Sequence, residues 1–205
     1  MVYSYTQISH YLTCPRRYRH RYLDGWQEKD TRDDRVRIRQ PRRSLQIKFT
    51  RPISEKNEFV AYIDAIGKVD GNGCLLEWKT TSSRYPEEPA GLLALDPQLV
   101  CYSWITGISE VAQVVFVRKR LVEIQYLRTT ITDEQRREFG HLVEDTIQRI
   151  ESAQFLPHSG IRFPQNHCSS CPYIGLCLDR KDLAEAALVR RPGAEDLGWL
   201  DELSY

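Results

Sequence analysis

The chain has 205 residues, of which 41% are hydrophobic and 28% charged, as is ordinary for a globular protein. It has neither an apolar run near the roughly 20 residues that cross a membrane nor the start of a secretory signal peptide, so we expect a cytoplasmic protein. The net charge is +1, but residues 16–51 hold 13 Lys/Arg and 5 Asp/Glu, a local balance of +8. This basic segment favours a phosphate-backbone partner, although a solvated loop explains it equally well.

Two short helices are predicted at the N-terminus. Ser4 opens a capping box, S-Y-T-Q, and Pro15 suits the first turn of a second helix with Cys14 near its cap. The second helix interleaves tyrosine with arginine, which is typical of proteins that bind single-stranded nucleic acid, although we expect the tyrosines to lie mostly in the core. The candidate DNA-binding residues are Arg16, Arg17, Tyr18, Arg19 and Arg21.

The next predicted elements are a loop over residues 24–45, a short strand over 46–50 and a hairpin over 59–81. The hairpin arms, 59–69 and 74–81, flank the turn sequence D-G-N-G. Side chains alternate faces along a strand, so Glu77 and Lys79 share one face and Trp78 the other. A two-residue turn at Asp70-Gly71 places Asp64 opposite Glu77, and the other likely turn lengths keep it on the same face.

Three charges on apolar strands are costly unless they pair with one another or bind a ligand. Two converging carboxylates, Asp64 and Glu77, suit an oxygen-preferring cation such as Mg²⁺ or Mn²⁺. The ammonium of Lys79 could orient a water molecule or balance the charge of a phosphate. The alternative is a salt-bridge ladder on a solvated sheet face.

The second half of the chain completes a mixed α/β pattern. After a Pro-rich loop, a helix is predicted from Pro97 to Ile105, closed by Gly107; Gln98 and Tyr102 share one of its faces. Two strands follow, over 110–119 and 121–129, and then a long helix to about residue 153. Its predicted apolar side comprises Phe139, Leu142, Val143, Ile147 and Ile150.

The pattern D-x(n)-E-x-K across a hairpin resembles the motif of the PD-(D/E)XK nuclease superfamily. The segments I-D-A-I and L-L-E-W-K-T-T are similar to those of its RecB-like branch. The resemblance implies a restriction-endonuclease-like central mixed sheet flanked by helices. It assigns metal binding to Asp64, Glu77 and the backbone carbonyl of Trp78, and a catalytic role to Lys79. Gln98 and Tyr102 match the Q-x-x-x-Y motif of that branch and join the catalytic set.

Four of the six cysteines form a second motif. Cys168, Cys171 and Cys177 have metal-ligand spacing, and Cys14 is the best fourth ligand; His167 is an alternative to one cysteine. This arrangement is similar to that of the RecB-like nucleases of the AddB and CRISPR-associated type, whose four cysteines hold a [4Fe–4S] cluster, and zinc is the alternative metal. The resemblance implies one nuclease-like domain over 1–205, with its core at about 46–153. The lobe joined by the cluster comprises 1–25 and 154–190, and 191–205 is a tail.

These observations predict a metal-dependent deoxyribonuclease, an exonuclease rather than an endonuclease, acting on DNA ends or single strands in DNA repair or CRISPR-type processing. The chain departs from the branch in one respect, because no histidine lies between His20 and Asp64 to serve as the further metal ligand. Glu58 is the substitute that the strand pattern offers. The alternative function is a weakly active or inactive DNA-binding module that works with a helicase or a CRISPR integrase.

Overall fold

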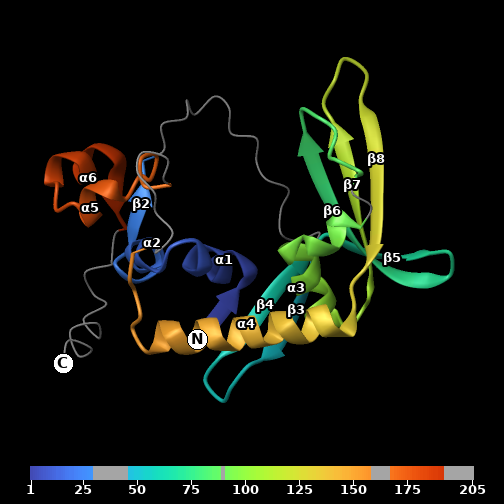
Figure 1. The fold of residues 1–205 in the computed structure, drawn as a ribbon, viewed down its shortest axis with the longest axis horizontal. Coiled ribbons are helices and arrows are strands. Elements are labelled where there is room, and N and C mark those ends of the chain that lie inside the picture. The colour runs from blue at the N-terminus through green and yellow to red at the C-terminus, as the bar shows by residue number, and fades with distance from the viewer. Residues whose placement is uncertain (30–45, 89–90, 158–166, 192–205) are drawn as a thin grey trace. The chain divides into compact units, whose positions relative to one another are not determined.

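The structure is a computed structural model that describes residues 1–29, 46–88, 91–157 and 167–191 (Figure 1). The chain divides into two compact units. One comprises Met1–Ile8 and Arg39–Gln148, and the other Ser9–Ile38 and Arg149–Tyr205. Within the described residues, no helix is long and apolar enough to span a membrane.

The first unit holds two sheets and the helices that accompany them. Its strands are β1 (Val2–Ser4), β3 (Ile47–Pro52), β4 (Glu58–Ile63), β5 (Ala65–Val69), β6 (Asn72–Thr81), β7 (Glu110–Val117) and β8 (Glu123–Thr130). Its helical segments are the start of α1 (Tyr5–Thr13), the 3-10 turn η4 (Leu92–Leu95), α3 (Pro97–Thr106) and most of α4 (Asp133–Glu151). The fold is therefore mixed α/β, as the sequence predicts.

The strands pair in the orders β1-β4-β3 and β5-β6-β7-β8. The second sheet is mixed, because β6 and β7 are parallel while β5–β6 and β7–β8 are antiparallel. The prediction of one continuous strand over 59–69 is wrong. The strand is interrupted at Asp64, and its two halves, β4 and β5, belong to different sheets. The break releases the backbone of Asp64 from both ladders and sets its side chain where the sheets diverge.

The register of the β5–β6 hairpin agrees with the two-residue turn considered from the sequence. Val69 pairs with Asn72, and the turn residues Asp70 and Gly71 have φ angles of 52° and 84°. Two consecutive positive φ angles characterise the tight turns that match the twist of paired strands. Because Ala65 pairs with Leu76, the residues before and after that pair, Asp64 and Glu77, lie opposite one another.

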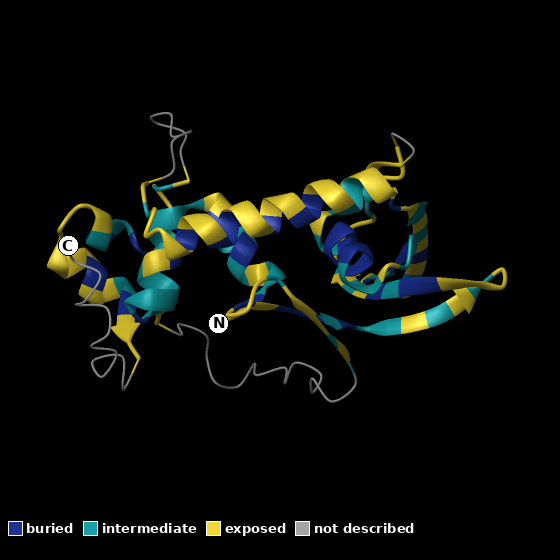
Figure 2. Cartoon of the chain, turned by 90° about the horizontal axis from the view of Figure 1, so that it is seen from below, coloured by how far each residue is buried: buried dark blue, intermediate teal, exposed yellow. Residues whose placement is uncertain are grey.

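Burial along β6 differs between its two halves (burial is coloured in Figure 2): Cys74 and Leu75, on opposite faces, are both buried, whereas from Glu77 onward buried or intermediate residues alternate with exposed ones. Leu75 and Glu77 are buried, whereas Trp78 on the opposite face is 45% exposed. The expected parity is therefore confirmed.

Helix α3 begins at Pro97, as the sequence predicts, and ends at Thr106, one residue beyond the predicted Ile105, with Gly107 (φ 78°) as its predicted C-cap. The capping box before α4 is also confirmed, since Thr132 Oγ1 accepts from the Gln135 amide at 3.2 Å. The predicted apolar side of α4 is wrong at one position, because Leu142 is 39% exposed. It lies at the edge of the buried stripe, where helical periodicity alone does not separate core from rim.

The second unit is built from short elements. They are the remainder of α1, α2 (Pro15–Tyr18), the π-helical turn η1 (Arg19–Leu23), β2 (Trp26–Glu28), the end of α4, α5 (Ile174–Cys177), α6 (Lys181–Ala187) and β9 (Leu188–Arg190). Strands β2 and β9 pair antiparallel.

Two predictions for this unit are wrong. Residues 26–28 form a strand rather than a loop, and the final helix ends at Ala187, after which the chain continues as β9. Three-residue strands acquire their conformation from the partner strand, which leaves little signal in the sequence. The segment 30–45 and the tail after Arg191 lie outside the described residues.

Packing of α5 against α6 requires a glycine. A Cβ added to Gly175 would overlap the backbone of Ala184, with the Ala184 Cα at 2.9 Å, and no side-chain rotation relieves a clash with backbone. We expect Gly175→Ala to lower the free energy of unfolding by about 1–3 kcal/mol in urea titrations. Gly73→Ala is the matched control, because nothing lies within 4 Å of its added Cβ. Equal stability of the two variants would contradict this packing.

Candidate active site

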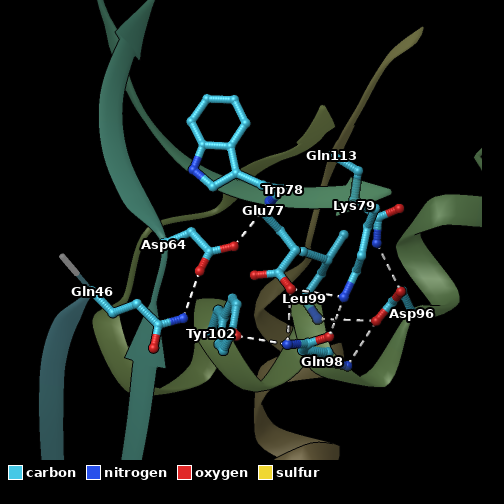
Figure 3. Close-up of polar contacts among 10 residues, drawn as sticks. All are labelled: Gln46, Asp64, Glu77, Trp78, Lys79, Asp96, Gln98, Leu99, Tyr102 and Gln113. Atoms are coloured by element: carbon cyan, nitrogen blue, oxygen red, sulfur yellow. Dashed lines mark hydrogen bonds and ion pairs between the residues drawn. The ribbon is translucent and has the colours of Figure 1, made fainter. Parts of the chain in front are cut away.

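Five predicted site residues come together in the first unit (Figure 3). Glu77 and Lys79 project from β6, Gln98 and Tyr102 from α3, and Asp64 from the junction of β4 and β5. The structure therefore assembles the three charges of the hairpin with both residues of the helix motif.

Glu77 is the buried centre of this site, only 5% exposed. Burial raises the pKa of its carboxyl group, Lys79 lowers it, and the negative charge of nearby Asp64 raises it again. The balance is a pKa above the ordinary value, since desolvation is the largest effect. Such a carboxylate favours any cation that replaces its lost hydration.

Lys79 is held by two acceptors. Its Nζ donates to Glu77 Oε1 and to Gln98 Oε1, each at 2.7 Å. The Gln98 Nε2 donates in turn to Glu77 Oε1 at 3.1 Å and to Tyr102 Oη at 2.7 Å. Burial and the charge of Glu77 raise the pKa of Tyr102, so its hydroxyl stays protonated. Gln98 thus fixes both the ammonium and the phenol relative to Glu77.

Asp64 accepts two hydrogen bonds from the protein. Its Oδ2 accepts from the backbone N–H of Trp78 at 3.0 Å, and its Oδ1 accepts from Gln46 Nε2 at 2.6 Å. Sequence reasoning missed Gln46, which precedes β3 and is 18 residues from Asp64 (Figure 3). Its only sequence signal is its place at the start of a strand that pairs with the strand leading to Asp64.

Asp96 and Gln113, which the sequence analysis also missed, fix the start of α3. Asp96 is the N-cap, and its Oδ1 accepts from the backbone amides of Gln98 at 2.8 Å and Leu99 at 3.3 Å. Its Oδ2 accepts from Nε2 of Gln113, a buried residue of β7 that pairs with Glu77. The side chain of Gln98 is therefore positioned by the same strand pair that carries Glu77.

The donor set fits a hard divalent cation at this site. Glu77 Oε2 is buried and accepts no hydrogen bond from the described residues, and an unsatisfied buried acceptor costs about 1–3 kcal/mol. Asp64 brings a second carboxylate to the same place, and oxygen donors are those that Mg²⁺ and Mn²⁺ prefer. Across the described chain, no group of three or more His, Cys, Asp and Glu side chains is arranged to hold a metal, so at this site the protein itself offers two carboxylates and no third.

The structure does not bring Glu58 into this set. Glu58 opens β4 and pairs with Pro52 and Val2, whereas Asp64 follows the other end of that strand. Six residues of extended chain span about 20 Å. The substitute ligand suggested by the strand pattern is thus at the wrong end of β4.

The four motif cysteines belong to the second unit and influence one another electrostatically. Burial raises the pKa of Cys177, Arg16 lowers it, and the neighbouring thiols of Cys171, Cys14 and Cys168 raise it. Cys14 is the N-cap of α2, and the Cys171 amide donates to the Cys168 carbonyl at 3.1 Å. These thiols approach one another, but they are not arranged as a closed metal site in the part of the chain that is described.

The arginine-rich turns of the second unit are largely paired. Arg17 lies 3.5 Å and Arg21 3.9 Å from Glu28 Oε1, and Arg19 lies 3.4 Å from Asp24 Oδ1. Tyr18 is only 1% exposed, so the expectation that the tyrosines lie mostly in the core is confirmed for this residue, and its place among the candidate DNA-binding residues is wrong. The Tyr18 ring packs against Tyr22 at 4.9 Å between centroids.

Comparison with known proteins identifies the family. The family described as the PD-(D/E)XK nuclease superfamily matches residues 33–178, well over half of the chain. No curated protein matches the sequence.

Two solved structures resemble parts of the chain. SSO0001 is 19% identical with a TM-score of 0.39, over 65% of this chain and 58% of the other. The protein named "Putative exonuclease" from Eubacterium rectale is 17% identical with a TM-score of 0.38, over 62% of this chain and 48% of the other. This chain thus spans about half the length of the solved chains that it matches.

The raised pKa of Glu77 predicts a pH dependence of cation binding. Protons compete for Glu77, so the affinity for Mn²⁺ should fall on acidification at a pH above the ordinary Glu pKa of about 4.3. Lys79 lowers that pKa, so Lys79→Met should move the midpoint upward by on the order of one pH unit. Calorimetric titration with Mn²⁺ from pH 4 to 8 measures this midpoint. Lys68→Met, on an exposed position of β5, is the control, and identical midpoints in both variants would contradict the coupling.

Proposed function

The chain belongs to the PD-(D/E)XK nuclease superfamily, and we propose that it is a metal-dependent nuclease that hydrolyses phosphodiester bonds of DNA at ends or in single strands. One observation carries the proposal: the buried, unpartnered Glu77 Oε2 lies beside Asp64, with the ammonium of Lys79 held at 2.7 Å from the other Glu77 oxygen. Most buried acceptors in folded proteins have a donor, so an unsatisfied carboxylate oxygen beside a second carboxylate supports a cation site over a salt-bridge ladder alone.

The residues that would hold Mg²⁺ or Mn²⁺ are Asp64, Glu77 and the carbonyl of Trp78. When bound, the cation supplies Lewis-acid polarisation of the phosphate and of the attacking water. Lys79 holds that water or a phosphate oxygen by hydrogen bonding, since its ammonium has three donors and two are already directed by Glu77 and Gln98. Gln98 keeps Lys79 in place by accepting a hydrogen bond from its ammonium group. The hydroxyl group of Tyr102 accepts in turn from Nε2 of Gln98 and so fixes the side-chain amide.

DNA binding is supported most directly at Arg16. It forms no ion pair with the described residues, in contrast to Arg17, Arg19 and Arg21. An unpaired guanidinium is available for a phosphate. The three paired arginines would have to exchange Glu28 or Asp24 for a phosphate.

We also propose that Cys14, Cys168, Cys171 and Cys177 hold a [4Fe–4S] cluster, with Zn²⁺ as the alternative. The support is the metal-ligand spacing of the three C-terminal cysteines, together with the position of Cys14 at the N-cap of α2 in the same unit. The role of the cluster would be structural, because it would join α2 to α5 within the second unit.

A second candidate function is a DNA-binding module without cleavage. The observation that favours it is the 2.6 Å hydrogen bond from Gln46 to Asp64 Oδ1, which occupies an oxygen that a nuclease needs for its cation. Such a module would act with a helicase or a CRISPR-type integrase, in repair or spacer processing.

Cleavage of end-labelled single- and double-stranded DNA with Mn²⁺ tests the nuclease. Glu77→Gln and Lys79→Ala should each reduce the rate at least about 100-fold. The control Lys68→Ala removes one exposed cation from β5 and should retain the parental rate. The position of the retained label separates exonuclease from endonuclease action.

Cleavage that survives in Glu77→Gln would contradict the assigned site. Tight DNA binding by a parent that does not cleave would instead support the DNA-binding module.

The cysteine site predicts a defined metal content. Protein purified without oxygen should contain about four iron atoms and four acid-labile sulfides per chain, and Cys14→Ser should lose them and melt at lower temperature. Cys101→Ala, which removes a fully buried thiol from α3, should keep the iron. One zinc per chain without sulfide would establish the alternative, and absence of both metals would contradict a metal centre.

A further inference from the structure

A groove of about 420 Å³ in the first unit belongs to none of the sites above. It lies where the C-terminal end of α3 meets the first half of α4 and the end of β3. Trp104, Arg51 and Gly140 are among its lining residues. None of them is among the residues drawn around Glu77 in Figure 3.

The indole of Trp104 presents an unused donor to this groove. Trp104 is 94% buried, being 6% exposed, with its ring packed edge-on against Phe59 and Phe139. Its Nε1–H has no acceptor among the residues that the structure describes, yet the nitrogen is not sealed from solvent. A Cβ on Gly140 would lie 2.8 Å from Nε1, so only a glycine at this position lets the donor edge of the indole pack this closely against α4.

Arginine side chains surround this donor. The Arg51 guanidinium lies 4.6 Å from the centroid of the Trp104 ring and donates to the Trp104 carbonyl at 2.9 Å. Arg136 donates to Ser103 Oγ at 3.3 Å. Arg137 lines the groove from an exposed position and forms no ion pair in the described part of the chain.

Two carboxylates also line the groove, and each lies near a nitrogen of a basic side chain. Asp133 is paired with Arg136, and Glu144 Oε2 lies 4.0 Å from His141 Nδ1. With His141 neutral, three arginines against two carboxylates leave the lining with one excess positive charge. An anion is therefore the ligand that the uncommitted donors, those of Trp104 and Arg137, can satisfy.

We propose that this groove binds a phosphate group, held by the Trp104 indole N–H and by the guanidinium groups of Arg137 and Arg51. Arginine offers paired N–H donors that match two oxygens of one phosphate. The phosphate could belong to a nucleic-acid strand or to a free nucleotide, and both sources share this chemistry. A groove of this size also accommodates the rest of a nucleotide.

The groove is separate from the catalytic face. Tyr102 and Trp104 are two residues apart on α3, and at 3.6 residues per turn such neighbours point to nearly opposite sides of a helix. Tyr102 reaches Gln98 in the site, whereas Trp104 reaches Phe139 on α4. The phosphate site therefore does not rest on the proposed nuclease reaction, and either can fail without the other.

The test follows the Trp104 indole N–H by NMR in the full-length ¹⁵N-labelled chain, with EDTA present to prevent cleavage. Trp104→Phe identifies its signal among the four indoles. The probes are inorganic phosphate, thymidine monophosphate and a short oligothymidylate. We expect a saturable shift of the Trp104 signal, and an affinity about tenfold weaker in Arg137→Ala.

Two further variants sharpen the result. Arg120→Ala removes an exposed arginine from the β7–β8 turn and should leave the affinity unchanged. Gly140→Ala should abolish the shift, because its Cβ would lie 2.8 Å from Nε1 and displace the indole. Much tighter binding of the oligonucleotide than of the mononucleotide identifies a strand phosphate, and equal affinities identify a free nucleotide. An unmoved Trp104 signal at millimolar concentrations of all three probes, or a shift unaffected by Arg137→Ala, would overturn the proposal.

Discussion

The buried carboxylate of Glu77 is the constraint on which the first unit depends. A charge removed from water must be paired and hydrogen-bonded, and both requirements are met through Oε1, which accepts from Lys79 and Gln98. Gln98 is placed by the N-cap Asp96, which Gln113 ties to the strand beside β6. The start of α3, the β6–β7 pairing and the charged site are therefore one connected network.

The break in the chain at Asp64 is the second determinant. A regular strand would keep this residue in a ladder, with its backbone groups committed to a neighbouring strand. Because β4 and β5 enter different sheets, the Asp64 carboxylate can accept from the Trp78 amide on one side and from Gln46 on the other. A change of sheet thus brings together groups from the residue before β3, the β4–β5 junction and β6, which the sequence separates by up to 32 residues.

Local rules predicted the parts of the site that depend on nearby residues. The parity of β6, the turn at Asp70-Gly71 and the shared face of Gln98 and Tyr102 follow from strand and helix periods. Gln46 and Gln113 could not be found in this way, because a glutamine acquires such a role only from the partner strand that tertiary pairing supplies. The short β2–β9 ladder was missed for the same reason, since propensity and pattern do not encode which distant segment covers a residue.

The two carboxylate oxygens of Glu77 link the stability of the fold to its proposed function. One oxygen is saturated by Lys79 and Gln98, while the other is buried without a donor from the described residues. That oxygen destabilises the metal-free fold by about 1–3 kcal/mol, a cost that a better hydrogen-bonded core would avoid. A ligand that binds only the folded state returns stability in proportion to its concentration over its dissociation constant. In the proposed nuclease, the same unsatisfied oxygen that weakens the fold would strengthen cation binding, as expected where a site trades stability for activity.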